Sequence, residues 1–199
     1  MNELERALRA GGPWGETEEA VRRFVERAHA NGLVDVAYAF VDSPLGPLTA
    51  AITRRGLVRL AYGDEDDALE DLAARLSPRL LERPSALEEV RRELDEYFGG
   101  RRDRFDVPID WALSRGFTRR ILRATARIPF GAVSSYTDVA ARAGSRRAYR
   151  AAGNALAANP IPIVVPCHRV LHKSGGLGGY TGGLDRKKFL LQLEGVLGR

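Results

Sequence analysis

The sequence is poor in cysteine, histidine and long apolar runs, and each shortage excludes a class of protein. A single cysteine, Cys167, rules out an internal disulfide framework like those of small secreted proteins. A structural zinc site is not expected, because only His29, His168 and His172 remain as further soft ligands. No apolar stretch approaches the roughly 20 residues that span a bilayer. The longest, residues 33–41, is interrupted by an aspartate.

The N-terminus also lacks the apolar core of a secretory signal, because charged residues recur from Glu3 onwards. We therefore expect a cytoplasmic protein without metal and without a membrane partner. The composition, 44% hydrophobic and 29% charged, is that of an ordinary globular protein. Its 199 residues suffice for one large domain or two small ones, each with a core.

Charge is distributed very unevenly along the chain. Residues 1–110 carry 16 Arg and 23 Asp or Glu, a balance of −7, whereas residues 111–199 carry 15 Lys or Arg and three acids, a balance of +12. A basic half joined to an acidic half indicates a polyanionic partner, and we expect nucleic acid. The alternative is an arginine-rich surface without a partner, which does not explain why the first half stays acidic.

The first half carries strand patterns followed by helix patterns. Residues 1–33 read as a helical extension that begins at Thr17. Strands are expected at 34–40, 48–53 and 57–62, and helices at 66–76 and 85–98, the second with a capping box of Ser85 and Glu88. The glycine- and arginine-rich segment 99–104 is the best candidate for a linker.

The second half, residues 111–199, changes to helices. We expect them at 117–127, at 135–144 with Ser135 as cap, and at about 145–158 with Ser145 as cap. Two short helices that meet at a glycine, the second with a cationic start, are typical of a helix-turn-helix. Any helical hairpin with a solvated arginine face is the alternative, and the charge distribution favours DNA.

Residues 159–169 are the most unusual stretch for chemistry. Three prolines in seven residues predict a stiff, extended backbone that presents Cys167 in a fixed pose beside His168 and Arg169. Neighbouring cations, or a histidine acting as base, are expected to lower the thiol pKa. Glu194, the only glutamate of the basic half, is the candidate to orient the histidine. The alternative is that Cys167 is a small buried apolar side chain and His168 a core histidine.

Six glycines between residues 175 and 183 surround Tyr180 and Thr181. Such a segment permits close backbone approach and positive φ, as a ligand-facing loop requires, although a surface hairpin is the alternative.

Four motifs in this order closely resemble the O6-alkylguanine-DNA alkyltransferases. They are Ile-Pro-Phe-Gly (128–131) through Ser-Tyr (135–136), Arg-Ala-Ala-Gly-Asn-Ala (150–155), Asn-Pro (159–160) with Pro-Cys-His-Arg (166–169), and Gly-Tyr-Thr-Gly-Gly (179–183) with Leu-Leu-Gln-Leu-Glu-Gly (190–195). The resemblance is dense over residues 114–196 and weaker over 34–110, where Asp-Ser-Pro-Leu-Gly (42–46) looks like the opening strand and turn. Residues 1–33 match nothing in it.

The resemblance implies a ribonuclease-H-like α/β domain followed by a winged helix-turn-helix domain that holds the active site. It further implies binding in the minor groove of duplex DNA and extrusion of the damaged nucleotide into a pocket, without a cofactor. We expect a monomer that acts on O6-alkylguanine in double-stranded DNA.

The same resemblance implies the roles of individual residues. Cys167 attacks the alkyl carbon, His168 removes the thiol proton through a water, Glu194 orients the histidine, and Asn159 braces the active-site turn. The pocket would be formed by Tyr136, which helps to rotate the nucleotide, and by Tyr180, Thr181 and the main-chain N–H of Cys167, which bind the guanine and its leaving oxygen. Arg150 would fill the vacated space in the stack, and Thr118, Thr137, Ser145 and Lys173 would contact the DNA backbone.

The chemistry agrees with these residue types. A thiolate suits displacement at saturated carbon, and because water cannot cleave the thioether product, each molecule acts once. Three departures stand out: Thr181 replaces a common serine, Phe130 and Ala132 replace a tyrosine and a glutamate, and the zinc ligands of some relatives are absent.

Three other functions compete with repair. A lesion-binding relative that transfers nothing carries tryptophan in place of Cys167, a winged-helix transcription regulator would ignore alkylation, and a cysteine hydrolase would turn over.

Overall fold

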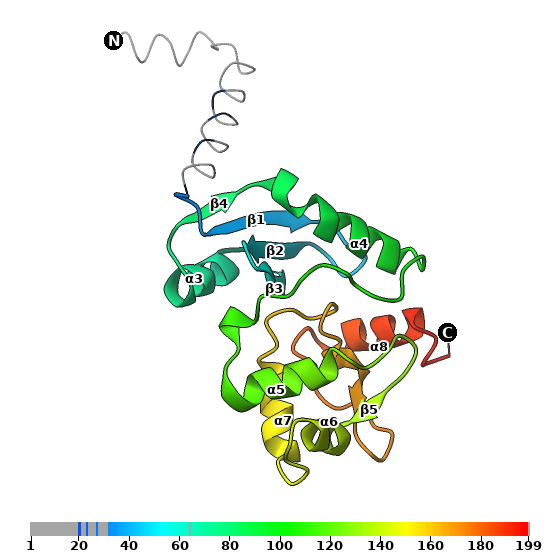
Figure 1. Cartoon of the computed structure of the whole chain (residues 1–199). Coiled ribbons are helices and arrows are strands. Elements are labelled where there is room, and N and C mark those ends of the chain that lie inside the picture. The colour runs from blue at the N-terminus through cyan, green and yellow to red at the C-terminus, as the bar shows by residue number, and fades with distance from the viewer. Residues whose placement is uncertain (1–19, 21–22, 24–26, 28–31, 64, 199) are drawn as a thin grey trace, which may run out of the picture.

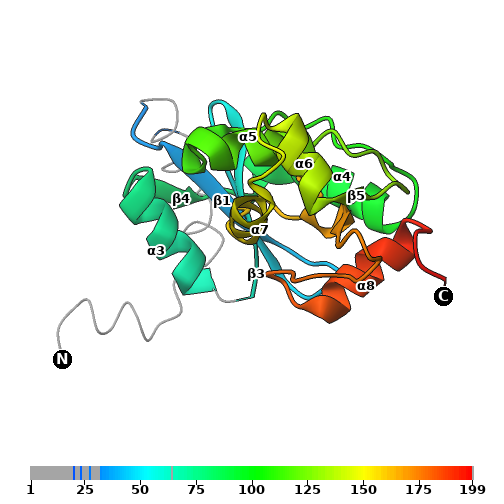
Figure 2. The same ribbon diagram turned by 90° about the horizontal axis from the view of Figure 1, so that it is seen from below.

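The computed structural model describes residues 20, 23, 27, 32–63 and 65–198. Residues 20, 23 and 27 are helical, and the rest of the predicted N-terminal helix, including its cap Thr17, lies outside the described residues. The sheet with its two helices forms one half of the molecule, and the elements from α5 onwards form the other (Figure 1). Helices α3 and α8 lie on opposite sides of the molecule in both views (Figure 2).

A four-stranded mixed sheet forms the first half, in the order β3-β2-β1-β4. Its strands are β1 (Val36–Val41), β2 (Leu48–Thr53), β3 (Gly56–Tyr62) and β4 (Leu80–Glu82). The first three, which were predicted as strands, form an antiparallel meander, and β4 pairs in parallel with β1. Strand β4 was not predicted, because three residues are too few to display an alternating pattern.

Helices α3 (Glu65–Arg75) and α4 (Glu88–Phe98) pack against opposite faces of this sheet. In α4 the buried side chains Val90, Leu94 and Tyr97 recur at helical spacing, so one stripe of the helix faces the core. The predicted capping box of this helix is wrong. Residues 84–87 form a 3₁₀ turn instead, and no side chain caps either helix start.

The predicted linker is irregular in structure but held firmly in place. Arg102 pairs with the carboxylates of Glu96 and Asp106, at 2.8 and 3.0 Å. The buried carboxylate of Glu93 accepts the backbone N–H groups of Asp106 and Val107. These bonds satisfy the loop backbone and fix how the chain enters its second half.

The second half consists of short helices, 3₁₀ turns and two short strands. They are η2 (Trp111–Leu113), α5 (Gly116–Thr125), β5 (Ser134–Ser135), α6 (Tyr136–Arg142), α7 (Tyr149–Ala157), η3 (Cys167–Arg169), β6 (Val170–Leu171) and α8 (Leu184–Leu193). Ser135 caps α6 as predicted, since its hydroxyl accepts the N–H of Asp138 and donates to that carboxylate. Gly144 has a φ of 91° in the turn that follows, which the predicted helix-turn-helix requires.

Two details of these helices differ from the sequence prediction. Ser145 does not cap α7, which begins four residues later, after Ala148. Of the arginines predicted at the start of this helix, Arg146, Arg147 and Arg150, only Arg150 lies within it. Helix α8 was not predicted, because its buried face does not coincide with its apolar residues: Lys187 is fully buried while Leu184 is 48% exposed.

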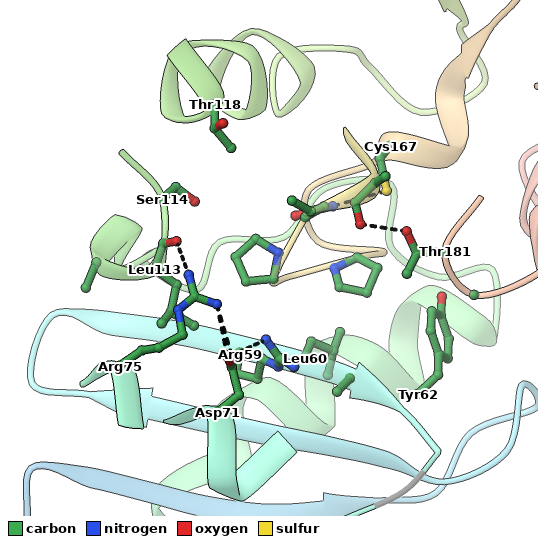
Figure 3. A pocket seen from close by; sticks show the side chains of 18 of the residues that line it. Arg59, Leu60, Tyr62, Asp71, Arg75, Leu113, Ser114, Thr118, Cys167 and Thr181 are labelled. Atoms are coloured by element: carbon green, nitrogen blue, oxygen red, sulfur yellow. Dashed lines mark hydrogen bonds and ion pairs between the residues drawn. The ribbon is translucent and has the colours of Figure 1, made fainter. Parts of the chain in front are cut away.

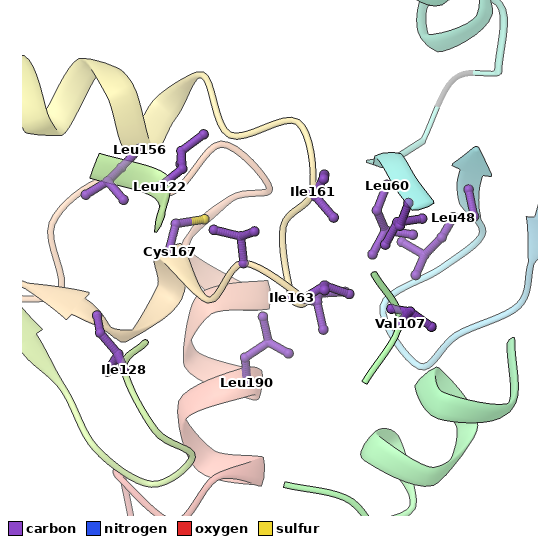
Figure 4. Close-up of a cluster of buried hydrophobic side chains, with 14 of the residues drawn as sticks. Leu48, Leu60, Val107, Leu122, Ile128, Leu156, Ile161, Ile163, Cys167 and Leu190 are labelled. Carbon is purple, nitrogen blue, oxygen red and sulfur yellow. The ribbon is translucent and has the colours of Figure 1, made fainter. Parts of the chain in front are cut away.

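A single apolar core joins the two halves. It includes Leu48 and Leu60 from the sheet and Leu122 and Leu190 from the helices, with the loop residue Ile161 between the two groups (Figure 4). Burial of one continuous core holds the sheet against the segment that carries Cys167. No helix among the described residues is long and apolar enough to cross a membrane.

Candidate active site

The proline-rich loop before Cys167 is folded into turns, so the prediction of an extended backbone is wrong. The N–H of Val164 bonds to Pro162 O at 2.9 Å, which closes a three-residue turn around Ile163. Ile163 has a φ of 73° and is fully buried, a conformation that strains a β-branched residue. The N–H of Cys167 closes a second such turn with Val165 O at 2.8 Å. Such strain persists only where the surroundings fix the backbone.

Two sets of hydrogen bonds fix this loop. Asn159 Nδ2 donates to Val165 O at 2.8 Å and to Cys167 Sγ at 3.1 Å, and its Oδ1 accepts the N–H of Ile161. Strand β3 adds a bond from the N–H of Leu60 to Pro160 O, at 2.9 Å. Asn159 thus spans the loop and contacts the sulfur, and the sheet supports the loop from the other side.

Cys167, His168 and Arg169 form a single 3₁₀ turn, in which successive side chains point about 120° apart. Cys167 lies against two cavities, whereas His168 and Arg169 point into the protein interior. The thiol of Cys167 is therefore accessible from the cavities, whereas the two residues that follow it contact only the interior. Arg169 bonds to Glu194 and to Ile128 O rather than to the sulfur.

Glu194 is the centre of a buried hydrogen-bond cluster. Its Oε1 accepts from Tyr97 at 2.7 Å, from His168 Nε2 at 2.8 Å and from Arg169 Nη2 at 2.9 Å, while Oε2 accepts from Arg169 Nε at 2.9 Å. Burial alone raises the pKa of this carboxyl, but the hydrogen bonds from His168 and Arg169 outweigh it and hold the pKa at about 2. The group is therefore an anion that orients the imidazole.

His168 is held as a neutral imidazole. Burial lowers its pKa, and the neighbouring Glu194 only partly offsets that effect. A neutral ring that donates from Nε2 to Glu194 carries its lone pair on Nδ1. Nδ1 is buried and has no hydrogen-bond partner among the described residues. The ring can thus accept a proton at Nδ1.

The thiol of Cys167 does not have the lowered pKa expected from its basic neighbours. Burial raises the pKa to about 11, although the hydrogen bond from Asn159 and the charge of Lys187 act in the opposite direction. The expectation failed because Arg169 is turned away and His168 is neutral. In the unbound chain the sulfur is protonated and needs a base.

A cavity of about 670 Å³ opens beside Cys167 and collects most of the residues expected to bind the lesion. Helices α6 and α7, residues 172–173 and the glycine-rich loop line it, and the expected residues among them are Tyr136, Thr137, Arg150, Cys167, Lys173, Tyr180 and Thr181. Its volume suits one small-molecule-sized group, such as an extruded base. The Tyr136 ring lies 5.2 Å from that of His172 and passes so close to Gly178 that a Cβ there would meet its hydroxyl at 2.5 Å.

The groups expected to bind guanine already have partners in the unbound chain. Thr181 Oγ1 donates to Ala157 O at 2.7 Å, and the hydroxyls of Tyr180 and Tyr62 are 2.8 Å apart. The N–H of Cys167 bonds to Val165 O. A base that accepted from Thr181 Oγ1 and from the N–H of Cys167 would have to displace Ala157 O and Val165 O.

A second cavity, of about 930 Å³, lies between the sheet and the other side of Cys167 (Figure 3). Thr118 lines this cavity and not the first one, while Cys167, Tyr180 and Thr181 line both. Ser145 lines neither of the two. Of the twelve predicted site residues, His168 and Glu194 lie buried behind Cys167, seven including Cys167 line the first cavity, Asn159 and Thr118 line the second, and Ser145 lines neither.

The sequence analysis missed Tyr97 and gave Arg169 the wrong role. Tyr97 reaches Glu194 from α4, and the Arg169 guanidinium clamps the same carboxylate. Tyr97 could have been identified from the sequence, because a tyrosine on the apolar stripe of a helix needs a buried hydrogen-bond partner for its hydroxyl. Among the described residues no cluster of three or more His, Cys, Asp or Glu could hold a metal ion.

Comparison with known proteins agrees with this geometry. Residues 36–111 match the ribonuclease-like domain, and residues 116–196 the DNA-binding domain, of 6-O-methylguanine DNA methyltransferase. The methylated-DNA–protein-cysteine methyltransferase of Mycolicibacterium paratuberculosis is 42% identical over 159 residues, covering 80% of this chain and 92% of that protein. The constitutive Bacillus subtilis enzyme of that name is 35% identical over 165 residues, covering 80% and 95%.

Solved structures give the same answer. Mycobacterium tuberculosis OGT in complex with DNA superposes with a TM-score of 0.69 at 39% identity, covering 79% of this chain and 92% of that one. The M. tuberculosis O6-methylguanine methyltransferase superposes with a TM-score of 0.67 at 38% identity, covering 80% and 92%. Since the two matched regions make up most of the chain, it belongs to the O6-methylguanine-DNA methyltransferase family.

Proposed function

We propose that this chain repairs O6-alkylguanine in DNA by transferring the alkyl group to Cys167. The observation that carries the proposal is the position of the only cysteine, at a cavity of about 670 Å³ and directly before a neutral, buried histidine. The family's relatives are methylated-DNA–protein-cysteine methyltransferases, and Cys167 is the one residue of this chain that can accept the group.

His168 removes the thiol proton through a bridging water at Nδ1, and Glu194 keeps the ring in the tautomer that leaves Nδ1 free. Asn159 holds the sulfur by its hydrogen bond. Because the thiol pKa is about 11 before DNA binds, this base is needed at neutral pH.

The bond changes balance without a co-reactant. A bond forms between Sγ and the alkyl carbon while the bond from that carbon to guanine O6 breaks. The electron pair stays on guanine, which gains a proton in place of the one lost from the thiol. Tyr180 and Thr181 stabilise the leaving guanine by hydrogen bonds. The thioether product is stable to water, so one molecule repairs one lesion, with no cofactor.

DNA binds across the α6–α7 face. Tyr136 turns the damaged nucleotide out of the stack, and the exposed Arg150 occupies the space it leaves. Thr137 and Lys173, which line the cavity, contact the sugar-phosphate backbone together with Thr118 and Ser145, which do not line it. We further propose that the chain acts as a cytoplasmic monomer, with domains over residues 34–110 and 111–199.

The test uses a duplex that carries O6-methylguanine with a labelled methyl group. Wild-type protein should retain the label after the DNA is removed, whereas Cys167→Ser should bind the lesion and retain none. Label retained by Cys167→Ser would overturn the assignment. A wild-type protein that binds one DNA sequence regardless of the lesion and retains no label would indicate a regulator instead.

A further inference from the structure

A tyrosine of the sheet domain touches the active site of the other domain. Tyr62 is the last residue of β3, and its hydroxyl lies 2.8 Å from that of Tyr180. The two rings meet edge to face, 6.3 Å between centroids. Figure 3 shows Tyr62 directed from the sheet towards the segment that carries Thr181.

Several contacts hold the Tyr62 ring in this position. The Arg186 guanidinium lies over the ring, 4.7 Å from its centroid. Arg186 also donates to Leu45 O in the sheet domain and to Gly182 O in the glycine-rich loop. A Cβ at Gly182 would lie 2.6 Å from the Tyr62 ring and 2.8 Å from that of Tyr180, so only glycine fits between them. The surrounding residues therefore fix the contact between Tyr62 and Tyr180 across the two domains.

The direction of the Tyr62–Tyr180 hydrogen bond determines what Tyr180 can offer a ligand. Each phenol has one proton to donate and can also accept. If Tyr180 donated to Tyr62, its proton would not be available to a base in the cavity. If Tyr62 donates, the Tyr180 proton points elsewhere, and within the described part of the chain the Tyr62 hydroxyl has no hydrogen-bond partner besides Tyr180.

We propose that Tyr62 is a positioning residue for alkyl transfer, which donates to the Tyr180 oxygen so that the Tyr180 hydroxyl donates to the departing guanine. This inference rests on the role of Tyr180 in the proposed function. As negative charge develops on the leaving base, the Tyr180 oxygen becomes richer in charge, and the hydrogen bond from Tyr62 strengthens with it. Both tyrosines have raised pKa values because of burial, so both hydroxyls keep their protons at neutral pH.

The test is a double-mutant cycle on the single-turnover rate constant of methyl transfer from an O6-methylguanine duplex, with DNA affinity measured separately. Tyr62→Phe should slow transfer roughly three- to ten-fold, the effect of losing one neutral hydrogen bond. Affinity for the duplex should not change, because Tyr62 does not line the first cavity. In the Tyr180→Phe background, Tyr62→Phe should cause no further loss, since it acts through the hydroxyl already removed.

Tyr38→Phe, on strand β1 of the same sheet and packed against a different apolar cluster from Tyr62, is the control and should transfer at the wild-type rate. A wild-type rate for Tyr62→Phe overturns the inference and leaves the proposed function intact. A loss of the same size in both backgrounds overturns it as well, because Tyr62 would then act by packing. A wild-type rate for Tyr180→Phe overturns this inference together with the role proposed for Tyr180, while loss of all transfer by wild-type protein would refute the proposed function itself.

Discussion

The two sides of Cys167 differ in almost every physical respect. Behind it lie His168 and Glu194, which are buried, charged or polar, and tied to one another and to Tyr97 by short hydrogen bonds. In front lies a cavity whose rim carries exposed cationic side chains such as Arg150 and Lys173. The buried side fixes the nucleophile and its base before DNA arrives, whereas the open side can adapt to the DNA.

This contrast explains how a strained loop can hold a reactive residue. The turn at Ile163 costs conformational energy, and the hydrogen bonds of Asn159 and the core packing around the loop offset that cost. Arg150 and Lys173 at the rim are exposed and act through their charge, which DNA recognises at longer range. Substitutions on the buried side should therefore change folding and chemistry, and those on the rim only DNA binding.

Glu194→Gln should have the largest effect on stability. It leaves the Arg169 guanidinium buried without its counter-charge, and breaking a buried ion pair costs about 3–5 kcal/mol. Urea unfolding measures this loss. The control is Glu96→Gln, where the carboxylate is 31% exposed and pairs with Arg102, and it should cost no more than about 1 kcal/mol. Equal stability of the two variants would contradict the contrast between the two sides.

The reactivity of Cys167 should depend on pH in a manner that reveals its burial. Burial disfavours the thiolate and raises the pKa to about 11 from the ordinary 9, so the thiolate fraction at pH 8 should be about a hundred-fold lower than that of a free thiol. The rate of alkylation by iodoacetamide should still rise about ten-fold per pH unit at pH 10. The urea-unfolded chain, as control, should level off near pH 9. A folded protein that levels off at or below pH 9 would refute the account.

Tyr97→Phe removes one hydrogen bond to a buried carboxylate and should cost about 2 kcal/mol of stability. The ring remains, so the packing of α4 changes little. Thermal or urea unfolding measures the loss, and Tyr149→Phe, at a side chain that is 46% exposed, should change stability by less than about 0.5 kcal/mol. If the two substitutions had equal effects, the hydroxyl of Tyr97 would have no part in the cluster.

Arg150→Ala should have the smallest effect on stability, within about 0.5 kcal/mol, because the side chain is exposed. It should nevertheless weaken binding to the lesion duplex. Arg92→Ala, on the acidic half and 61% exposed, is the control and should leave DNA affinity unchanged. Measuring the affinity of both variants for the lesion duplex tests this difference between the two arginines. Unchanged binding by Arg150→Ala would show that Arg150 does not contact the DNA.

Much of the fold could be predicted from local patterns. Strand β2 and helix α5 agree with their predicted ranges to within two residues, because alternation and helical spacing are local properties. Strand β4 and helix α8 were missed, the one for its brevity and the other because Lys187 is buried inside it, where its ammonium group bonds to Val170 O and Leu177 O. Those acceptors belong to a distant segment, and no local pattern reveals them.

The sequence indicated several residues of the candidate site but not how they are connected. Pro-Cys-His-Arg and Glu194 could be identified from sequence, yet adjacency placed Arg169 beside the thiol, whereas the 3₁₀ turn directs it to Glu194. Tyr97 and Tyr62 reach the site from the sheet domain, across 97 and 118 residues of chain. Such contacts depend on how the two domains pack together, so no local sequence pattern predicts them.

The most direct test of the account is intact-protein mass spectrometry after incubation with excess duplex that contains O6-methylguanine, followed by mapping of the modified peptide. We expect a mass gain of one methyl group per molecule, located on Cys167, and no further gain as incubation is prolonged. An unmodified protein, a methyl group on any other residue, or release of the methyl group with turnover would contradict the central claim.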